Sequence, residues 1–371
     1  MNQKLFLKLF LLFTIIVGVN HALYAQNTNT EKKLKLYGDF RFRTEFDRNS
    51  DRMDGTTRDD RDRLRYRLRF GFTYKLDKNF EFGGRIRSGN PQNQQSPHVT
   101  LGKEFHSDDF SIDKAYLKIK SDNGLWAWLG KNSMPFWGQN ELLWDGDVNP
   151  EGIAIGNNFK VNDNTKLSPV LAYFIVDHSG KTFSDDSSLF IGQLKLSSKI
   201  GDDNLIISTG IISGKDLPNK PDGNATFMLD YTIWASSLQY KVNKFTLGLD
   251  YFSNLKNYDN NPNIDAVFKD QDTGYVGSVK YDFNKFQLGY YYAHIEKYAV
   301  VDYLAQDDWV RWGNSDMTRS SNFSGHEFRA VYKINSKFNM VLRAYFVDGL
   351  ETTGTTLESG TRIRFDFNIK F

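Results

Sequence analysis

The chain has 371 residues, of which 40% are hydrophobic, 15% are aromatic and none is cysteine. The lack of cysteine excludes disulfide scaffolds, thiolate metal sites, a cysteine nucleophile and a lipid-modified cysteine anchor. Two of the 47 basic residues lie near the N-terminus, and the other 45 balance the 45 acidic residues. This neutral balance argues against a nucleic-acid partner, since nucleic-acid binders carry a basic footprint.

Residues 1–25 have the pattern of a secretory signal peptide. Lys4 and Lys8 form a positive region before the apolar run "LFLLFTIIVGV", and "NHALYAQ" supplies small residues for cleavage after Ala25, with Ala22 as a competing site. The apolar run is shorter than the roughly 20 residues of a membrane-spanning helix. We therefore predict a signal peptide over 1–25, a short segment over 26–32 and a folded domain over 33–371.

The stretch "RDRLRYRLRFGFTYKL" (61–76) alternates arginine with apolar residues. A helix would scatter these arginines around its circumference, whereas a strand places them all on one side and the apolar residues on the other. The same alternation predicts sixteen strands, most of them long enough to cross a membrane at a tilt. The predicted strands are 33–46, 61–75, 79–89, 110–121, 124–131, 151–160, 166–177, 187–199, 204–214, 229–242, 244–254, 272–282, 285–297, 322–334, 337–347 and 360–371.

Short polar turns recur between these strands. "YKLDKNFEFG" (from 74), "YKVNKFTLG" (240), "YDFNKFQLG" (281) and "YKINSKFNM" (332) each place a polar turn between aromatic residues, and further turns are predicted near 121, 161 and 200. Seven short turns alternating with longer loops put both termini on one side. We predict an all-β, up-and-down, transmembrane antiparallel barrel of about sixteen strands with short periplasmic turns and long extracellular loops. A soluble β-sandwich is the structural alternative.

The strand number bears on function, because sixteen strands leave an aqueous channel whereas eight are filled by side chains. The first three strands and the last become neighbours when the barrel closes, so their arginines are predicted to form one surface, which we name the basic wall. The basic wall consists of Arg41, Arg43, Arg63, Arg65, Arg67, Arg69, Arg85, Arg87, Arg362 and Arg364.

The loop over 131–150 is rich in aromatic and acidic residues. Such a loop is predicted to fold inward and constrict the pore, with its acids facing the basic wall, because fixed charges act strongly in a narrow channel. An outward loop with solvated charges is the alternative. The candidate residues of the constriction are Trp137, Glu141, Trp144, Asp145, Asp147 and Glu151.

The sequence resembles the putative porins of Gram-negative outer membranes. The resemblance lies in "GDFRFRTEF" (38), "RDRLRYRLRFGF" (61), "RIRSGNPQNQQSPHVTLGKEF" (85), "IDKAYLKI" (112) and "LLWDGDVNPEGIA" (142), and continues afterwards only as strand pattern. It implies a porin-type barrel, with Asp39, Arg41, Arg63, Arg65, Arg67, Trp144, Asp145 and Glu151 on motif positions. A lesser similarity is to alginate-export barrels. Phe367, Ile369 and Phe371 are similar to the C-terminal signal read by the barrel-assembly machinery.

Three motifs are set aside. "HSGKT" (178) lacks the upstream glycine of a phosphate-binding loop, because Ile175 occupies that position, and "HEFRA" (326) has Ala330 where a zinc protease needs its second histidine. The first long loop, "DRNSDRMDGTTRDDRD" from Asp47, holds six aspartates and four arginines. Self-neutralisation is the favoured interpretation there, with a divalent cation or lipopolysaccharide contact as the alternative. No catalytic residue, metal site or cofactor is predicted.

The sequence thus predicts a non-enzymatic porin of the outer membrane, reached through a signal peptide, that lets small hydrophilic solutes diffuse passively with weak anion preference. A substrate-selective uptake or export channel for oligosaccharides or anions is the alternative within this class. A barrel enzyme and a structural or adhesive barrel are the alternatives outside it. The expected partners are membrane lipid and lipopolysaccharide, the assembly machinery and a possible homotrimer.

Overall fold

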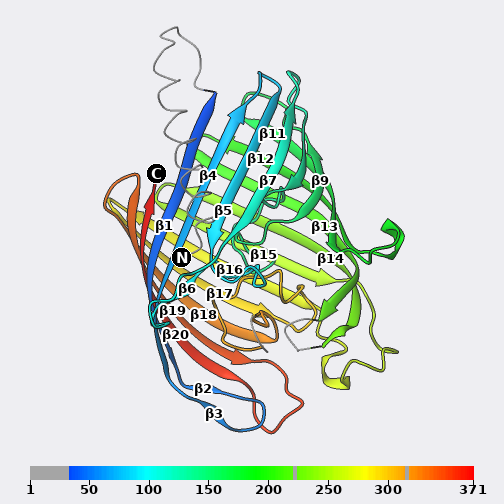
Figure 1. The fold of residues 1–371 in the computed structure, drawn as a ribbon, viewed down its shortest axis with the longest axis vertical. Helices are drawn as coiled ribbons and strands as arrows, with labels where there is room; N and C mark the ends of the chain where they lie inside the picture. Colours follow the sequence, from blue (N-terminus) through cyan, green and yellow to red (C-terminus); the bar gives the residue numbers. More distant parts are fainter. Residues whose placement is uncertain (1–32, 220–223, 314–316) are drawn as a thin grey trace, which may run out of the picture. The chain divides into compact units, whose positions relative to one another are not determined.

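Period-two alternation produces strands along the whole barrel unit, Leu36–Phe371 (Figure 1). The computed structural model describes residues 33–219, 224–313 and 317–371, so the predicted signal peptide and the segment 26–32 lie outside the described residues. The long strands are β1 (Leu34–Arg48), β4 (Arg61–Lys75), β5 (Phe80–Ser88), β7 (Phe110–Lys120), β8 (Trp126–Lys131), β9 (Glu151–Gly156), β11 (Thr165–Asp177), β12 (Ser187–Ile200), β13 (Asp203–Asn219), β14 (Asn224–Val242), β15 (Phe245–Asn254), β16 (Thr273–Phe283), β17 (Phe286–Ile295), β18 (Phe323–Lys333), β19 (Phe338–Gly349) and β20 (Ser359–Lys370).

Short elements complete the secondary structure. β10 (Phe159–Lys160) continues β9 along β11, and β6 (Val99–Thr100) continues the pairing of β4 beyond the end of β5. β2 (Ser50–Asp51) and β3 (Thr57–Arg58) form a separate hairpin in the first long loop. Two 3-10 turns, η1 (Phe183–Asp185) and η3 (Ala266–Phe268), lie in other loops. No helix in the described part of the chain is long and apolar enough to cross a membrane.

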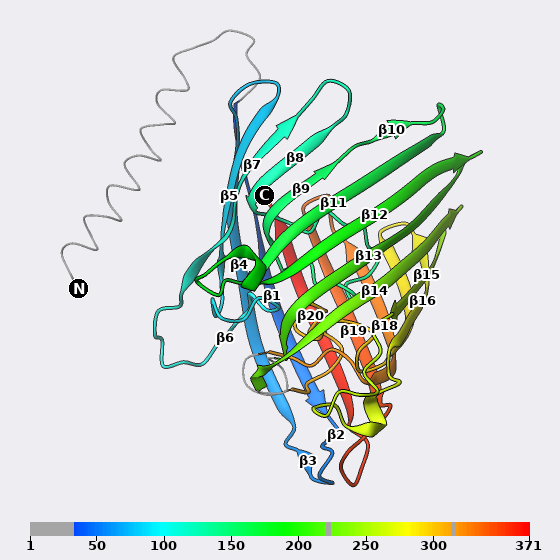
Figure 2. The same ribbon diagram turned by 90° about the vertical axis from the view of Figure 1, so that its right-hand side faces the viewer.

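The strands form one closed antiparallel sheet. Each long strand pairs with the next along the chain, and β20 returns to pair with β1, with Asp39 opposite Lys370 and Arg48 opposite Thr361 (Figures 1 and 2). Counting β9 and β10 as one strand and taking the two-residue β6 as an addition to β4, the described residues make sixteen barrel strands. The prediction of an all-β, up-and-down, sixteen-stranded barrel is therefore confirmed.

The seven predicted short turns all connect neighbouring strands. Asn243 and Asn284 adopt left-handed backbone conformations, with φ of 51° and 52°, in the turns after β14 and β16. Asparagine tolerates this conformation better than most residues, which explains why it marks these turns in the sequence. The main difference in strand length is at β13, predicted to end near 214. There Asp216, with φ of 51°, lies in a register shift after which pairing with β14 resumes.

The two sides of the barrel wall differ in chemistry. On β4, the side chains of Leu64 and Phe70 are 46% and 38% exposed, whereas Arg65 and Arg67 are 7% and 6% exposed. Large apolar side chains with similar exposure follow the outside of nearly every strand. Apolar residues outside and charged residues inside is the pattern of a transmembrane barrel and the reverse of a soluble one.

Loops fill much of the interior next to β13–β19. Residues of the loop after β17, among them Trp309 and Trp312, pack with Leu142 and Trp144 of the loop after β8. The barrel contributes Ile212, Ile233, Phe252, Ala293 and Phe323 to the same apolar cluster. The two loops are therefore held inside the barrel by burial of apolar surface as well as by polar contacts.

Candidate functional site

The arginines of the basic wall share one inner surface, as expected for neighbouring strands, but most of them are paired with carboxylates. Across the seam between β1 and β20, Arg43 Nε lies 2.6 Å from Asp366 Oδ1, Arg364 Nε lies 2.6 Å from Glu45 Oε2, and Arg362 Nε lies 2.6 Å from Asp47 Oδ1. This pairing was not predicted from the sequence. The surface is a ladder of alternating charges and not a row of free guanidiniums.

The pairing continues on β4 and β5. Arg63 pairs with Glu45, Arg67 and Arg69 both pair with Asp39 at 2.8 and 2.7 Å, and Arg85 pairs with Asp113 at 2.5 Å. All three acids come from neighbouring strands, β1 and β7, on the same inner side. The alternating acids of β1 were visible in the sequence as the pattern "GDFRFRTEFD", in which Asp39, Glu45 and Asp47 share the period-two positions of Arg41 and Arg43.

Three members of the basic wall have no carboxylate within hydrogen-bonding distance among the described residues. Arg41 Nε donates to Asn368 Oδ1 at 2.7 Å, and the nearest acid, Asp366, lies at 4.0 Å. Arg65 donates to Ser96 Oγ at 3.1 Å, with Glu45 at 3.9 Å. Arg87 donates to the carbonyls of Asn93 and Gln94. The wall therefore keeps a small surplus of positive charge.

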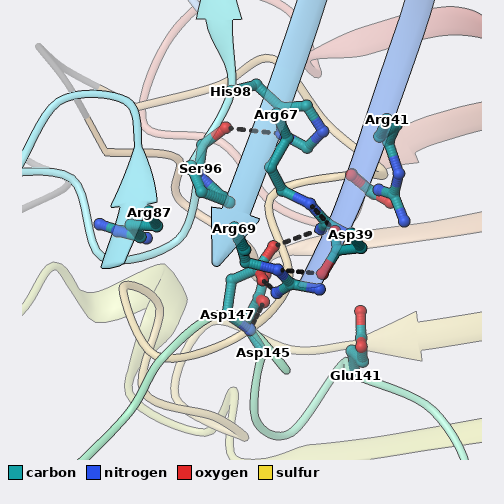
Figure 3. Close-up of polar contacts among 12 residues, drawn as sticks. Asp39, Arg41, Arg67, Arg69, Arg87, Ser96, His98, Glu141, Asp145 and Asp147 are labelled. Carbon is teal, nitrogen blue, oxygen red and sulfur yellow. Dashed lines mark hydrogen bonds and ion pairs between the residues drawn. The ribbon is translucent and has the colours of Figure 1, made fainter. Parts of the chain in front are cut away.

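The loop between β8 and β9, residues 132–150, reaches the basic wall. Asp147 accepts hydrogen bonds from Arg67 at 3.3 Å and Arg69 at 2.5 Å, so the two arginines converge on Asp147 and Asp39 (Figure 3). Asp145 Oδ1 accepts the backbone N–H of Asp147 at 2.7 Å, and Asn149 donates to Asp113 at 2.6 Å. These contacts hold the second half of the loop against β4 and β7.

The first half of the same loop is fixed to the other side of the barrel. The backbone of Trp137 exchanges two hydrogen bonds of 2.8 Å with the side-chain amide of Gln193 on β12. Gln139 donates to the carbonyls of Leu238 on β14 and Leu249 on β15. Loop 132–150 thus has polar contacts to inner strand surfaces on both sides of the interior.

The acids of this loop ionise differently because their surroundings differ. Burial and the neighbouring carboxylates of Glu141 and Asp147 raise the pKa of Asp145 well above its usual range. Burial and Asp147 also raise the pKa of Glu141, whose carboxylate accepts a 2.8 Å hydrogen bond from Gln306. Burial opposes ionisation of Asp147 as well, but Arg67 and Arg69 outweigh it and hold the pKa of Asp147 below its usual range.

The remaining predicted site residues lie elsewhere. Glu151 opens β9 and pairs with Lys131 at 2.7 Å on the outward side, so it is not among the acids that meet the basic wall. Trp144 is buried in the apolar cluster, and its Nε1 donates to the carbonyl of Val148 at 3.0 Å. Phe367 and Ile369 are at the end of β20, followed by Phe371, and the side chains of Ile369 and Phe371 are exposed.

A second inward loop was missed by the sequence analysis. Asp308, in the loop after β17, accepts hydrogen bonds from Arg364 and from Arg343 at 2.8 Å and lies 3.6 Å from Arg43. Arg362 donates to the backbone carbonyls of residues 307, 308 and 310. The segment "AVVDYLAQDDWVRW" (299–312) has the aromatic and acidic content that was the reason for predicting an inward fold at 131–150. The same criterion would have found it.

The sequence motifs set aside earlier have ordinary surroundings. In the first long loop Arg48 pairs with Asp62 at 2.5 Å, and Arg58 pairs with Glu358 at 2.6 Å. His178 lies 3.0 Å from Asp186 in a surface loop, and His326 on β18 stacks on Tyr290. Within the three described ranges no group of three His, Cys, Asp or Glu side chains is placed to hold a metal ion.

The fold and its inward loop place the molecule in the class of sixteen-stranded porin-type barrels, and comparison with known proteins identifies the family. The family model described as "Putative porin" matches residues 50–311, which is more than half of the chain. The chain therefore belongs to the putative porin family. No curated protein matches the chain.

Solved porins share the fold at low sequence identity. Pseudomonas putida OprB is 12% identical over 91% of this chain and 94% of its own, with a TM-score of 0.55. Salmonella typhi OmpF, solved in complex with daunomycin, is 12% identical over 91% of this chain and 97% of its own, with a TM-score of 0.56. Vibrio cholerae OmpT with loop L8 deleted is 14% identical over 91% and 99%, with a TM-score of 0.51.

Proposed function

We propose that this protein is a porin of the outer membrane, forming a water-filled channel through which small hydrophilic solutes diffuse down their gradients. The observation that carries the proposal is the closed sixteen-stranded wall with apolar side chains outside and paired charges inside. A barrel of this size has more interior than its strand side chains can fill. Membership of the putative porin family supports the same function.

Weak anion preference is the finer part of the proposal. It rests on Arg41, Arg65 and Arg87, which hold positive charge on the basic wall beyond what the adjacent carboxylates neutralise. Loop 132–150 acts as the constriction, because it crosses the interior from its bonds with Gln193 on β12 to its ion pairs with Arg67 and Arg69 on β4. Fixed charges beside a narrow passage filter solutes by charge as well as by size.

The surroundings of the barrel follow from the same assignment. The signal peptide over 1–25 directs export, the seven short turns face the periplasm, and the long loops other than loop 132–150 and the loop containing Asp308 face the outside and contact lipopolysaccharide. Phe367, Ile369 and Phe371 serve as the signal for the assembly machinery. A homotrimer through the lipid-facing strands completes the proposal.

Two loops inside the barrel favour the alternative of a substrate-selective channel. Both loop 132–150 and the loop containing Asp308 occupy the interior, which leaves a passage narrower than the barrel wall alone would give.

The test is reconstitution of the mature protein into a planar bilayer under a salt gradient, with conductance and reversal potential read together. A steady conductance with a reversal potential directed toward the anion is the expected result. Conductance with cation preference would refute the anion preference but would still support the proposed channel. A folded barrel that conducts nothing and admits no sugar in a liposome-swelling assay would refute the channel itself.

A further inference from the structure

A cavity of about 260 Å³ lies between loop 132–150 and the inner side of β14 and β15. The lining includes four aromatic side chains and three carboxylates. The aromatic residues are Phe136, Trp137, Trp144 and Phe252, and the carboxylates are Glu141, Asp145 and Asp250. Small-molecule sites usually measure about 300–1,000 Å³, so this cavity suits a small organic molecule better than an oligosaccharide.

The walls of the cavity are held in place by hydrogen bonds. The backbone of Trp137 is bonded to Gln193, and Asn140 donates to the carboxylate of Asp250 on β15. The indole of Trp144 is fixed by its bond to the carbonyl of Val148. A ligand therefore meets a pre-formed site and does not have to order the loop on binding.

The charge of the cavity is of one sign. Its lining contains three carboxylates and neither lysine nor arginine. Asp145 is only 3% exposed, and one of its carboxylate oxygens, Oδ1, accepts the backbone N–H of Asp147. The other oxygen, Oδ2, accepts no hydrogen bond from any residue in the described ranges. Oδ2 is not one of the fully enclosed oxygens of the described residues, so a hydrogen-bond donor on a ligand in the cavity can reach it and satisfy it.

The basic wall does not neutralise this cluster. Asp147, two residues from Asp145, forms ion pairs with Arg67 and Arg69. Asp145 itself has no ion pair among the described residues. The raised pKa of Asp145 and that of Glu141 have the same origin, namely burial beside like charges. A bound cation would stabilise the ionised forms of both acids and displace a proton from them.

The aromatic lining selects among cations. Aromatic faces attract positive charge and also remove hydrocarbon from water, whereas a hydrated metal ion prefers a shell of oxygens. The described residues contain no group of three acidic or histidine side chains arranged for a metal. The cavity thus matches a cation that carries an apolar body.

We propose that this cavity binds a small organic amine, with its ammonium group donating to Asp145 and its apolar body against Trp137 and Phe252. The proposal rests on the proposed function in one respect, since the solute reaches the cavity through the channel. None of the surplus arginines lines the cavity, so an amine site and a weak anion preference for small ions are compatible.

Binding is measured by isothermal titration of the folded mature protein in detergent with three probes of similar shape: benzylamine, benzyl alcohol and benzoate. Benzylamine is expected to bind on the order of tenfold more tightly than the other two, because only it supplies both the charge and the ring. Asp145→Asn should lower benzylamine affinity on the order of tenfold and leave benzyl alcohol unchanged. Trp137→Leu should weaken both probes, since the bonds from residue 137 to Gln193 come from its backbone.

The control variant is Asp163→Asn, which removes an exposed carboxylate in a short turn, with its side chain 92% exposed. It should not change benzylamine affinity. Equal affinity for benzylamine and benzyl alcohol would overturn the amine assignment in favour of a neutral solute, and an unchanged affinity in Asp145→Asn would place the amine elsewhere. Conductance of the same preparation separates the two proposals: conduction without binding refutes the amine site, and binding without conduction refutes the channel.

Discussion

At the scale of single residues, the seam that closes the barrel is specified by charge. Arg43, Glu45 and Asp47 of β1 lie directly opposite Asp366, Arg364 and Arg362 of β20, so three successive inward positions are complementary. A slip of two residues in one direction would oppose Arg43 to Arg364, and in the other direction it would oppose Glu45 to Asp366. Like charges directly opposite each other are destabilising, so the register of closure is fixed by these pairs.

The first prediction concerns one partner of this seam. Asp366→Asn removes the closer of the two carboxylates beside the buried Arg43 and leaves only Asp308, at 3.6 Å, and breaking a buried ion pair costs about 3–5 kcal/mol. The side chains of Arg43 and Asp366 are both 1% exposed, so solvent offers little compensation. We expect urea unfolding, followed by tryptophan fluorescence and by the heat-dependent shift in gel mobility, to occur at clearly lower urea than in the wild type. The exposed-site variant Asp163→Asn serves as the control, and a midpoint for Asp366→Asn equal to that of the control would contradict the prediction.

The second prediction concerns charge selectivity. Replacing Arg65 and Arg67 together by serine removes two positive charges from the basic wall, while Asp39 and Asp147 keep their bonds to Arg69. We expect the reversal potential under a salt gradient to shift toward the cation without loss of the folded barrel. The matched control replaces both arginines by lysine and keeps the charge, so its selectivity should stay near that of the wild type. An unchanged reversal potential in the serine variant would show that these arginines do not set selectivity.

At the scale of elements, strands and turns were predictable because their causes are local. The alternation that makes β4 lies within its own fifteen residues, and the turns at Asn243 and Asn284 contain a residue that tolerates their backbone conformation. The inward loops were only half predictable. Composition indicated that loop 132–150 folds inward, but its anchors Gln193 and Leu249 belong to distant strands, and no local pattern marks such partners.

The acids that neutralise the basic wall also divide into those that local sequence predicts and those that depend on distant packing. Glu45 and Asp47 could be placed beside the arginines from strand alternation and barrel closure alone. Asp308 could not, because its position depends on how the loop after β17 packs its tryptophans against the barrel. Glu151 was expected to join the constriction, but it is the first residue of β9 and its position along that strand directs it outward.

The third prediction concerns the loop containing Asp308. This one carboxylate contacts Arg43, Arg343 and Arg364, so Asp308→Asn removes the main charged anchor of the loop. We expect a looser loop and a larger single-channel conductance in planar bilayers. Asp307→Asn is the matched control, because it removes the same charge at the adjacent position but leaves the three ion pairs intact. Equal conductance in both variants would mean that the apolar cluster alone holds the loop.

At the scale of the whole molecule, the interior combines an ordinary protein core with a charged surface. The loops after β8 and β17 bury tryptophans against β13–β19, while the opposite strands β20, β1 and β4 supply the ladder of ion pairs. Because the interior charges are paired with one another, they do not depend on water in an open lumen to stabilise them. Stability and permeation can therefore be separated experimentally, because the seam governs the first and the loops govern the second.

The fourth prediction concerns the dependence of stability on pH. His98, in the segment between β5 and β6, is buried, and its Nε2 has no hydrogen-bond partner in the described part of the chain. Burial, followed by the charges of the nearby wall arginines, first among them Arg43 and Arg65, holds the pKa of His98 well below its usual value. Between the pKa values of His98 in the folded and in the unfolded chain, the unfolded chain binds more protons. The free energy of unfolding is therefore not reduced by His98 above about pH 6.5, and it decreases as the pH falls below that value.

His98→Gln removes this proton linkage while keeping a polar side chain. The free energy of unfolding of the wild type, relative to the variant, should therefore fall by about 1.4 kcal/mol for each pH unit below roughly 6.5. Urea titrations at pH 7.5, 6.0 and 5.0 would measure this difference. The control is His106→Gln at a nearby exposed histidine, whose side chain is 75% exposed. If the wild type and His98→Gln lose stability in parallel on acidification, the segment between β5 and β6 opens before the barrel unfolds, and His98 takes up its proton without opposing the fold.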